Sequence, residues 1–310
     1  MVLRKLVLAL ALLLAPQCIP AAVQANPNAF QPYRLAYQGR MVTDVFLNGK
    51  GPFTFLIDTA SSHSIIYEHV RTQLGIVPAG APITIFGINA ATQAIPVRPD
   101  MLEVAGESIK GLTMGVLPDS EQGKDPDGVL GIDVLSRYFV VLDRRQQQFR
   151  LLAPGSQNQD AYADWVSVPL EPRPLKIIPV NFWYFTTIFK DQSINCLFDL
   201  GSGLTLFNWD AAARLGYERR DFLKLGPPPN KLRDALGKTA PVVLLTGMRV
   251  NIGTRQWLQR EVLVSDAPVF EFFGLDDKAG AIVGPGLLHD NSLGIDFAGH
   301  RLYIGPTVYR

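Results

Sequence analysis

After its first 25 positions the chain consists mainly of short apolar runs that are broken by turn-forming residues. Residues 44–47 and 53–57 are strand-like, and the intervening Asn48-Gly49 is a strong β-hairpin signal. Further strand-like runs follow at residues 83–86, 138–142 and 149–152. Helical periodicity is confined to short stretches, notably residues 68–74 and 210–215. The pattern predicts an all-β fold with a few short helices, which Gly75 and Gly216 are placed to end.

One pattern of apolar and small residues occurs twice. An apolar run ends in Asp58-Thr59-Ala60-Ser61, and another ends in Asp199-Leu200-Gly201-Ser202, 141 residues later. Two apolar residues and a glycine follow downstream in each copy, ending at Gly131 and Gly284. We expect these glycines to let their segments pass closely beneath the Asp turns. Two copies of one unit could bring Asp58 and Asp199 face to face, and two carboxylates that share a proton can activate water.

The duplication divides the chain into two lobes. We assign residues 26–155 to the first and 156–310 to the second, because residues 153–165 include a polar, turn-rich stretch without apolar period. With 47% apolar and 18% charged residues the chain is globular rather than disordered. The net charge of +1 and the lack of a basic stripe argue against a nucleic-acid partner.

Residues 1–25 have the pattern of a secretory signal peptide: Arg4-Lys5, a short apolar run and small residues before a cut at Asn26. We therefore expect export, most simply to a bacterial periplasm, with secretion as the alternative. Lipid attachment at Cys18 is less favoured, because Pro16-Gln17 precede it. No later segment is apolar and long enough for a membrane anchor. The mature chain then has a single cysteine, Cys196, expected to be a small buried residue rather than a reactive thiol.

The two Asp turns, each with its apolar-apolar-glycine partner, resemble the halves of an aspartic protease of the pepsin and retropepsin clan. The resemblance covers nearly the whole mature chain and implies two similar retropepsin-like β-barrel lobes, related by pseudo-two-fold symmetry. It places the active-site cleft between the lobes. A single-chain monomer acting on a peptide or protein substrate is expected, with no cofactor and no metal.

In this resemblance Asp58 and Asp199 are the catalytic pair, which shares one proton and hydrolyses the peptide bond through an activated water. The supporting residues are Thr59, Ser61, Gly201 and Ser202. The hydroxyls of Ser61 and Ser202 are expected to donate to the carboxylates, which favours their charged form and moves the working pH downward. Thr59 is expected to bond to the opposite turn.

Two positions depart from the family pattern of Asp-Thr/Ser-Gly-Ser/Thr/Ala. Leu200 lacks the hydroxyl that would bond to the first turn, and Ala60 replaces a glycine, so that its methyl group would crowd the substrate or strain the turn. Each turn is followed by a candidate flap, a hairpin that would close over substrate, although two ordinary hairpin turns explain them nearly as well. The flap candidates are Gly87, Ile88 and Asn89 in the first lobe and Leu236 and Gly237 in the second.

Other residues favour structural roles. The aromatic run of residues 182–185 is interpreted as a buried or inter-lobe strand in preference to a substrate-contacting surface. His63 and His69 lie six apart without a completing Cys or Glu, so no zinc site is expected. The main hypothesis is an exported aspartic endopeptidase. A non-catalytic peptide-binding pseudoprotease on the same fold is the alternative, and a structural envelope protein is the third.

Overall fold

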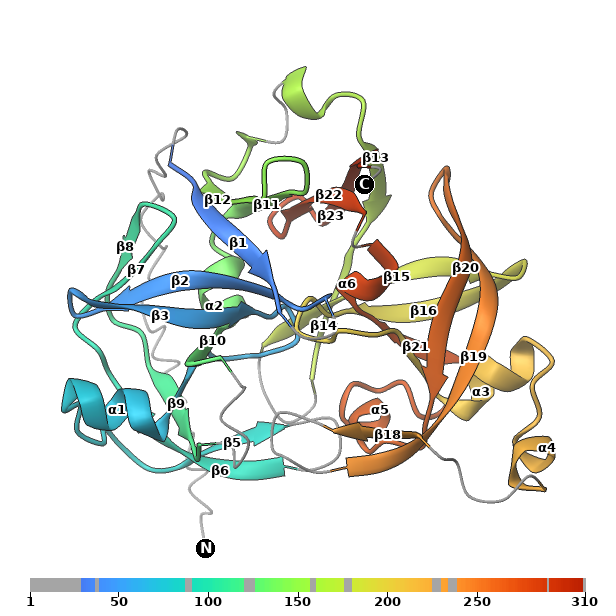
Figure 1. The fold of residues 1–310 in the computed structure, drawn as a ribbon, viewed down its shortest axis with the longest axis horizontal. Coiled ribbons are helices and arrows are strands. Elements are labelled where there is room, and N and C mark those ends of the chain that lie inside the picture. The colour runs from blue at the N-terminus through green and yellow to red at the C-terminus, as the bar shows by residue number, and fades with distance from the viewer. Residues whose placement is uncertain are drawn as a thin grey trace, which may run out of the picture.

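The computed structural model describes residues 29–36, 39–86, 91–119, 126–156, 160–175, 180–224, 230–233, 239–288 and 290–308. Within them the strands form two sheets, of 15 and 8 strands, and the helices have seven residues or fewer (Figure 1). The expected two-lobed, all-β fold is confirmed.

The larger sheet contains β1 (Gln31–Leu35), β2 (Met41–Leu47), β3 (Lys50–Ile57), β4 (Ile65–Tyr67), β5 (Ile83–Phe86), β6 (Ala91–Val97), β7 (Leu102–Val104), β8 (Glu107–Ile109), β9 (Met114–Leu117), β10 (Gly128–Leu130), β11 (Phe139–Asp143), β12 (Gln148–Leu152), β13 (Val166–Pro169), β22 (Asn291–Asp296) and β23 (Arg301–Thr307). The smaller sheet contains β14 (Glu171–Pro174), β15 (Asn181–Phe189), β16 (Gln192–Phe198), β17 (Leu206–Phe207), β18 (Asn230–Arg233), β19 (Thr239–Ile252), β20 (Arg255–Val264) and β21 (Gly280–Val283). The helices are α1 (Glu68–Leu74), α2 (Ile132–Leu135), the 3-10 turn η3 (Asp160–Tyr162), α3 (Trp209–Arg214), α4 (Arg219–Leu223), α5 (Val269–Phe272) and α6 (Pro285–Leu288).

The two halves of the chain join through equivalent strands. β11 and β22, which hold corresponding positions in the two copies, pair antiparallel, with Phe139 opposite Asp296 and Leu142 opposite Leu293. Because two equivalent strands pair antiparallel, exchanging them leaves the pairing unchanged, and a pseudo-two-fold axis therefore passes between them. Figure 1 shows this joining region at the top, with β2 and β3 on one side and β15 to β21 on the other.

The turns follow the residue types that the sequence supplies. Asn48 and Gly49 both have positive φ in the tight β2–β3 hairpin, as the Asn-Gly signal predicts. Gly75 ends α1 in the left-handed conformation, and its N–H donates to the carbonyls of Arg71 and Thr72. Gly216 follows α3 with a φ of 87°. These local expectations are therefore confirmed.

The aromatic run of residues 182–185 lies in β15 and is buried, as the strand interpretation expected. Cys196 is fully buried, and burial raises the pKa of its thiol to about 12, which agrees with a structural role. The proposed boundary region, residues 153–165, includes η3, whose Tyr162 packs edge-to-face on Phe139 at 5.2 Å. The division at residue 155 stays a prediction.

Several predictions fall outside the described residues. They are the signal peptide at 1–25, Cys18, and the flap candidates Gly87, Ile88, Asn89, Leu236 and Gly237. Where the chain is described, no helix has the length and apolar character needed to cross a membrane.

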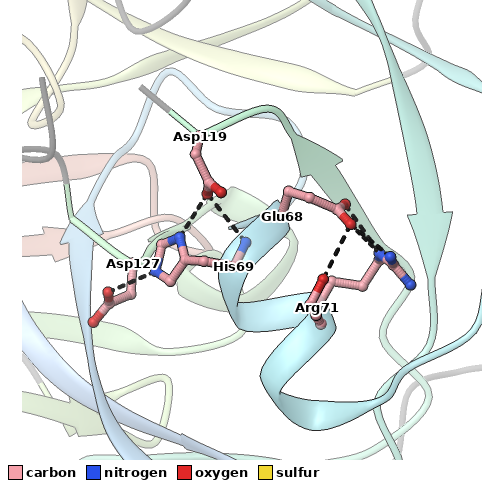
Figure 2. Close-up of polar contacts among 6 residues, drawn as sticks. Glu68, His69, Arg71, Asp119 and Asp127 are labelled. Atoms are coloured by element: carbon pink, nitrogen blue, oxygen red, sulfur yellow. Dashed lines mark hydrogen bonds and ion pairs between the residues drawn. The ribbon is translucent and has the colours of Figure 1, made fainter. Parts of the chain in front are cut away.

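A polar cluster ties α1 to the start of β10 (Figure 2). His69 Nδ1 lies 2.6 Å from Asp119 Oδ1, and His69 Nε2 lies 3.0 Å from Asp127 Oδ1. The other carboxylate oxygen of Asp127 accepts a hydrogen bond of 2.7 Å from the Thr54 N–H of β3. Beside this cluster, Arg71 pairs with Glu68 one turn earlier on α1.

Candidate active site

Both Asp turns are built in the same way. β3 runs parallel to β10, and the Asp58 N–H donates to the Leu130 carbonyl at 3.1 Å. β16 runs parallel to β21, and the Asp199 N–H donates to the Val283 carbonyl at 3.0 Å. Each aspartate therefore follows directly after a strand, β3 or β16, and its N–H is held by the neighbouring parallel strand, β10 or β21.

The expected role of Gly131 and Gly284 is confirmed. A methyl group on Gly131 would lie 2.7 Å from the His63 carbonyl carbon and 2.9 Å from the Ser61 oxygen. One on Gly284 would lie 2.8 Å from the Leu204 oxygen and would overlap the Ser202 oxygen. Each Asp turn therefore packs directly against a glycine. This close approach of two backbone segments is possible only for a residue without a Cβ atom.

Backbone N–H groups hold the carboxylates. Ala60 N–H donates to Asp58 Oδ1 at 2.7 Å. Gly201 N–H and Ser202 N–H donate to Asp199 Oδ1 at 2.8 and 3.1 Å. Such bonds favour the charged carboxylate.

The expectation for the two serine hydroxyls was wrong. Ser61 Oγ donates to the His63 carbonyl, and Ser202 Oγ donates to the Leu204 carbonyl, each at 2.7 Å. Each hydroxyl therefore closes a local turn with the residue two positions ahead, an alternative that serine readily takes. Backbone N–H groups, rather than hydroxyls, contact the carboxylates.

The structure brings the two aspartates together, close enough for each carboxyl group to act on the pKa of the other. Asp199 is buried, and Asp58 is half-buried. Burial, and then the adjacent Asp58 charge, raise the pKa of Asp199 well above its usual value. Burial also raises the pKa of Asp58, although the N–H of Ala60 and the bond with Asp199 act against it. Burial therefore favours a proton shared by the pair, which titrates above the usual carboxyl range rather than below it, contrary to our sequence-based expectation.

Thr59 bonds across the lobe interface. Its hydroxyl donates to the Phe198 carbonyl at 2.8 Å and accepts from the Leu200 N–H at 3.0 Å. Leu200, which holds the equivalent position in the second turn, is fully buried in the main apolar core. One half of the chain thus supplies a polar link between the turns, and the other supplies apolar packing.

Gly201 and Ala60 hold equivalent positions but have different surroundings. A methyl group on Gly201 would lie 2.7 Å from Asp58 Oδ1 and would overlap the carboxyl carbon. Ala60 already carries such a methyl group, does not adopt a positive φ, and packs against the second-lobe core cluster. The expected backbone strain at Ala60 is therefore absent, and glycine is needed for space in the second turn only.

The strands beside the flap candidates form antiparallel pairs in both lobes. β5 pairs with β6 across residues 87–90, and β18 pairs with β19 across residues 234–238. Figure 1 shows both pairs on the side of the molecule opposite the joining region. The flap assignment itself stays a prediction.

Sequence reasoning missed a buried carboxyl group beneath the first turn. Ser64 Oγ donates to Asp133 Oδ1 at 2.7 Å and accepts from the Gly131 N–H at 3.1 Å. Burial raises the pKa of Asp133. The position of Asp133, two residues after Gly131, was a usable signal. Arg40, whose charge acts on Asp58, had no signal in the sequence.

The arrangement suits proton transfer through a carboxyl pair. Among the described residues, no group of three or more His, Cys, Asp or Glu side chains could hold a metal ion. The available chemistry is that of one ionised and one protonated carboxyl group in a buried setting, which are the parts needed to deprotonate a water and protonate a carbonyl oxygen.

Comparison with known families agrees with this geometry. Residues 43–134 match the family model described as aspartyl protease, a segment that contains the first Asp turn and the glycine beneath it. A search of curated proteins gave no match. This match supports an aspartyl protease of the retropepsin-like kind, and with it a peptide hydrolase as the general class.

Proposed function

We propose that the chain is a single-chain aspartic endopeptidase whose two lobes contribute one catalytic carboxyl group each. The observation that carries the proposal is the juxtaposition of Asp58 and Asp199, one from each copy of the repeated turn, with the Asp58 carboxyl group directly against Gly201. The matched family adds the general class of reaction to this observation.

In the proposed mechanism the ionised Asp58 takes a proton from a water molecule, and the water oxygen attacks the peptide carbonyl carbon. Asp199 donates its proton to the carbonyl oxygen, which gives a neutral tetrahedral intermediate without a covalent enzyme link. Collapse breaks the C–N bond, and the amine leaves with the proton from Asp58. The other hydroxyl proton of the intermediate returns to Asp199 as the carboxylic acid product forms. The greater burial of Asp199 supports this division, because burial favours the protonated carboxyl group that acts as the acid.

The test is cleavage of a diverse peptide library by the mature chain from Asn26 across acid to neutral pH. Asp58→Asn and Asp199→Asn should each lower kcat/KM by about 10²–10⁴-fold or more, with the circular dichroism spectrum unchanged. Asp276→Asn, at an exposed position, serves as the matched control and should retain full activity. Full activity in Asp58→Asn would contradict the assignment of the pair.

A peptide-binding pseudoprotease is the second candidate, and Leu200 is the observation that favours it. A buried leucine stands where a hydroxyl would complete the link between the turns. This candidate expects peptide binding without turnover by well-folded protein at every pH. Cleavage that disappears in Asp58→Asn would exclude it.

We also propose that the chain acts outside the cytoplasm, in a periplasm or as a secreted protein. The support is the signal-like pattern of residues 1–25. Mass spectrometry of the protein recovered from the producing cells should give an N-terminus at Asn26. An intact Met1 on the active protein would contradict export by this route.

A further inference from the structure

A small cavity lies beside the first Asp turn, with walls from both lobes. Ala60 of the turn and Ile85 of β5 line it from the first lobe, and Phe182 of β15 and Phe272 of α5 line it from the second. Because Ala60 follows Asp58 by only two residues, a side chain in this cavity would belong to a residue near the scissile bond.

The cavity is narrow. The space open to the centre of a water-sized sphere in it is about 20 Å³, whereas a protein cavity that binds benzene has a volume of about 150 Å³. A methyl or hydroxymethyl group fits into such a space. The isobutyl group of leucine or the ring of phenylalanine does not.

The aromatic walls are held in place by packing. Phe182 and Phe272 each pack edge-to-face on Phe273, with ring centroids 5.0 and 4.8 Å apart. Phe182 is 1% exposed. Contact with the same buried neighbour restricts rotation of both rings, which limits widening of the cavity.

One edge of the cavity is polar. Ser61, Ser62 and His63 line it, and Ser62 Oγ lies 3.0 Å from His63 Nδ1. A small side chain with a hydroxyl group therefore meets hydrogen-bonding groups there as well as apolar walls.

We propose that this cavity is a substrate subsite that admits only a small residue, Ala or Ser, at one fixed position near the scissile bond. The inference rests on the proposed peptide hydrolysis and adds the substrate class to it. A pocket discriminates by about 10–200-fold for each methylene that it cannot accommodate, so we expect Ala to be favoured over Leu by at least about 100-fold in kcat/KM.

Two measurements on the mature wild-type chain test the proposal. Alignment of the cut sites from a mixed peptide library should show one position enriched in Ala and Ser and depleted of Leu, Phe and Trp. A pair of peptides that differ only by Ala or Leu at that position then gives the ratio of kcat/KM. Phe272→Ala and Ile85→Ala should each lower this ratio about tenfold or more, by raising kcat/KM for the Leu peptide.

Leu258→Ala, at a side chain that is 61% exposed on β20, is the matched control and should leave the ratio unchanged. Ile85→Ala, on the opposite wall of the cavity, gives the same measurement if Phe272→Ala does not fold. Cleavage with Leu or Phe accepted equally at every position would overturn this proposal and leave the proposed function intact. Absence of any cleavage by folded protein would overturn both.

Discussion

Thr59 and Leu200 occupy equivalent positions in the two Asp turns, and they contact each other through one hydrogen bond. The Thr59 hydroxyl accepts from the Leu200 N–H and donates to the adjoining Phe198 carbonyl. Thr59 is fully buried, so the bond is shielded from water. Thr59 thus supplies a polar link between the lobes at the candidate active site, which Leu200 cannot supply from the equivalent position.

This link predicts that Thr59→Val destabilises the protein. Valine keeps the shape of threonine but leaves a buried N–H and a buried carbonyl without their partner. The free energy of unfolding should fall by about 1–3 kcal/mol, as measured by urea denaturation. Peptide hydrolysis should fall as well, because the two carboxyl groups depend on this contact for their alignment.

Thr205→Val is the matched control for Thr59→Val. The hydroxyl of Thr205 is also buried but has no hydrogen-bond partner among the residues that the structure describes. Its replacement should change the stability by less than about 0.5 kcal/mol or increase it. Equal losses in the two variants would show that the contact across the lobes contributes nothing specific.

The buried carboxyl pair predicts a stability cost at neutral pH. Burial and the Asp58 charge raise the pKa of Asp199, so the native state binds more protons than the unfolded state above the ordinary pKa of 3.8. The free energy of unfolding therefore falls as the pH rises from about 3.8 towards the raised pKa. Asp199→Asn removes this cost and should stabilise the protein at pH 7 by on the order of 1 kcal/mol or more.

Denaturation of Asp199→Asn and wild type at several pH values checks this prediction. The difference should shrink below about pH 4, where Asp199 is protonated in both states. The exposed Asp276→Asn should change the stability by less than about 0.5 kcal/mol throughout. A variant that is less stable than wild type at pH 7 would contradict the raised pKa.

Much of the fold was predictable because local signals and the duplication agreed. The Asn48-Gly49 hairpin and the glycine at the end of α1 depend on backbone conformations that few residues adopt. The glycines at 131 and 284 were recognisable because each ends the same apolar-apolar-glycine pattern downstream of its Asp turn. These features are short-range or repeated, so one sequence contains enough information for them.

The predictions from sequence that were wrong concern which of several nearby polar groups bond to each other. Ser61 and Ser202 are at the expected positions in the sequence. In the structure, however, backbone N–H groups donate to the carboxylates, and the serine hydroxyls donate to carbonyls two residues ahead. Arg40 and Phe272 act at the site through the tertiary fold alone, and no local pattern marks them. Which atoms meet across 100 residues or more depends on packing that periodicity does not encode.

The asymmetry between Gly201 and Ala60 gives a third prediction. Gly201→Ala would push its methyl group into the Asp58 carboxyl, and a displacement of about 1 Å at the reacting groups can cost about 100-fold in rate. We expect kcat/KM to fall by about 100-fold with the fold retained. Ala60→Gly, the matched change in the other turn, should keep activity within about tenfold of wild type. Similar losses in both variants would show that the two turns are equivalent in their spatial needs.

The His69 cluster of Figure 2 gives the last prediction, which concerns pH. Partial burial lowers the pKa of His69, but the hydrogen bonds and charges of Asp119 and Asp127 outweigh it, so the pKa lies above the ordinary 6.5. The stabilisation is then complete below the unfolded pKa and is lost as the pH rises through the folded value. Because His69 is half-exposed, His69→Gln should cost no more than about 1 kcal/mol at pH 5.5.

The pH dependence separates this effect from an ordinary loss of packing. The stability difference between wild type and His69→Gln should decline as the pH is raised from 5.5 to 9, because the wild-type histidine loses its proton. Glu68→Gln is the control on the same helix: Glu68 pairs with Arg71, and the hydrogen bond from Arg71 lowers its pKa, so both groups stay charged over this range. Its effect should therefore not vary with pH. A His69→Gln effect that is constant from pH 5.5 to 9 would show that the two carboxylates do not hold the protonated imidazole, and that α1 is joined to the start of β10 by packing alone.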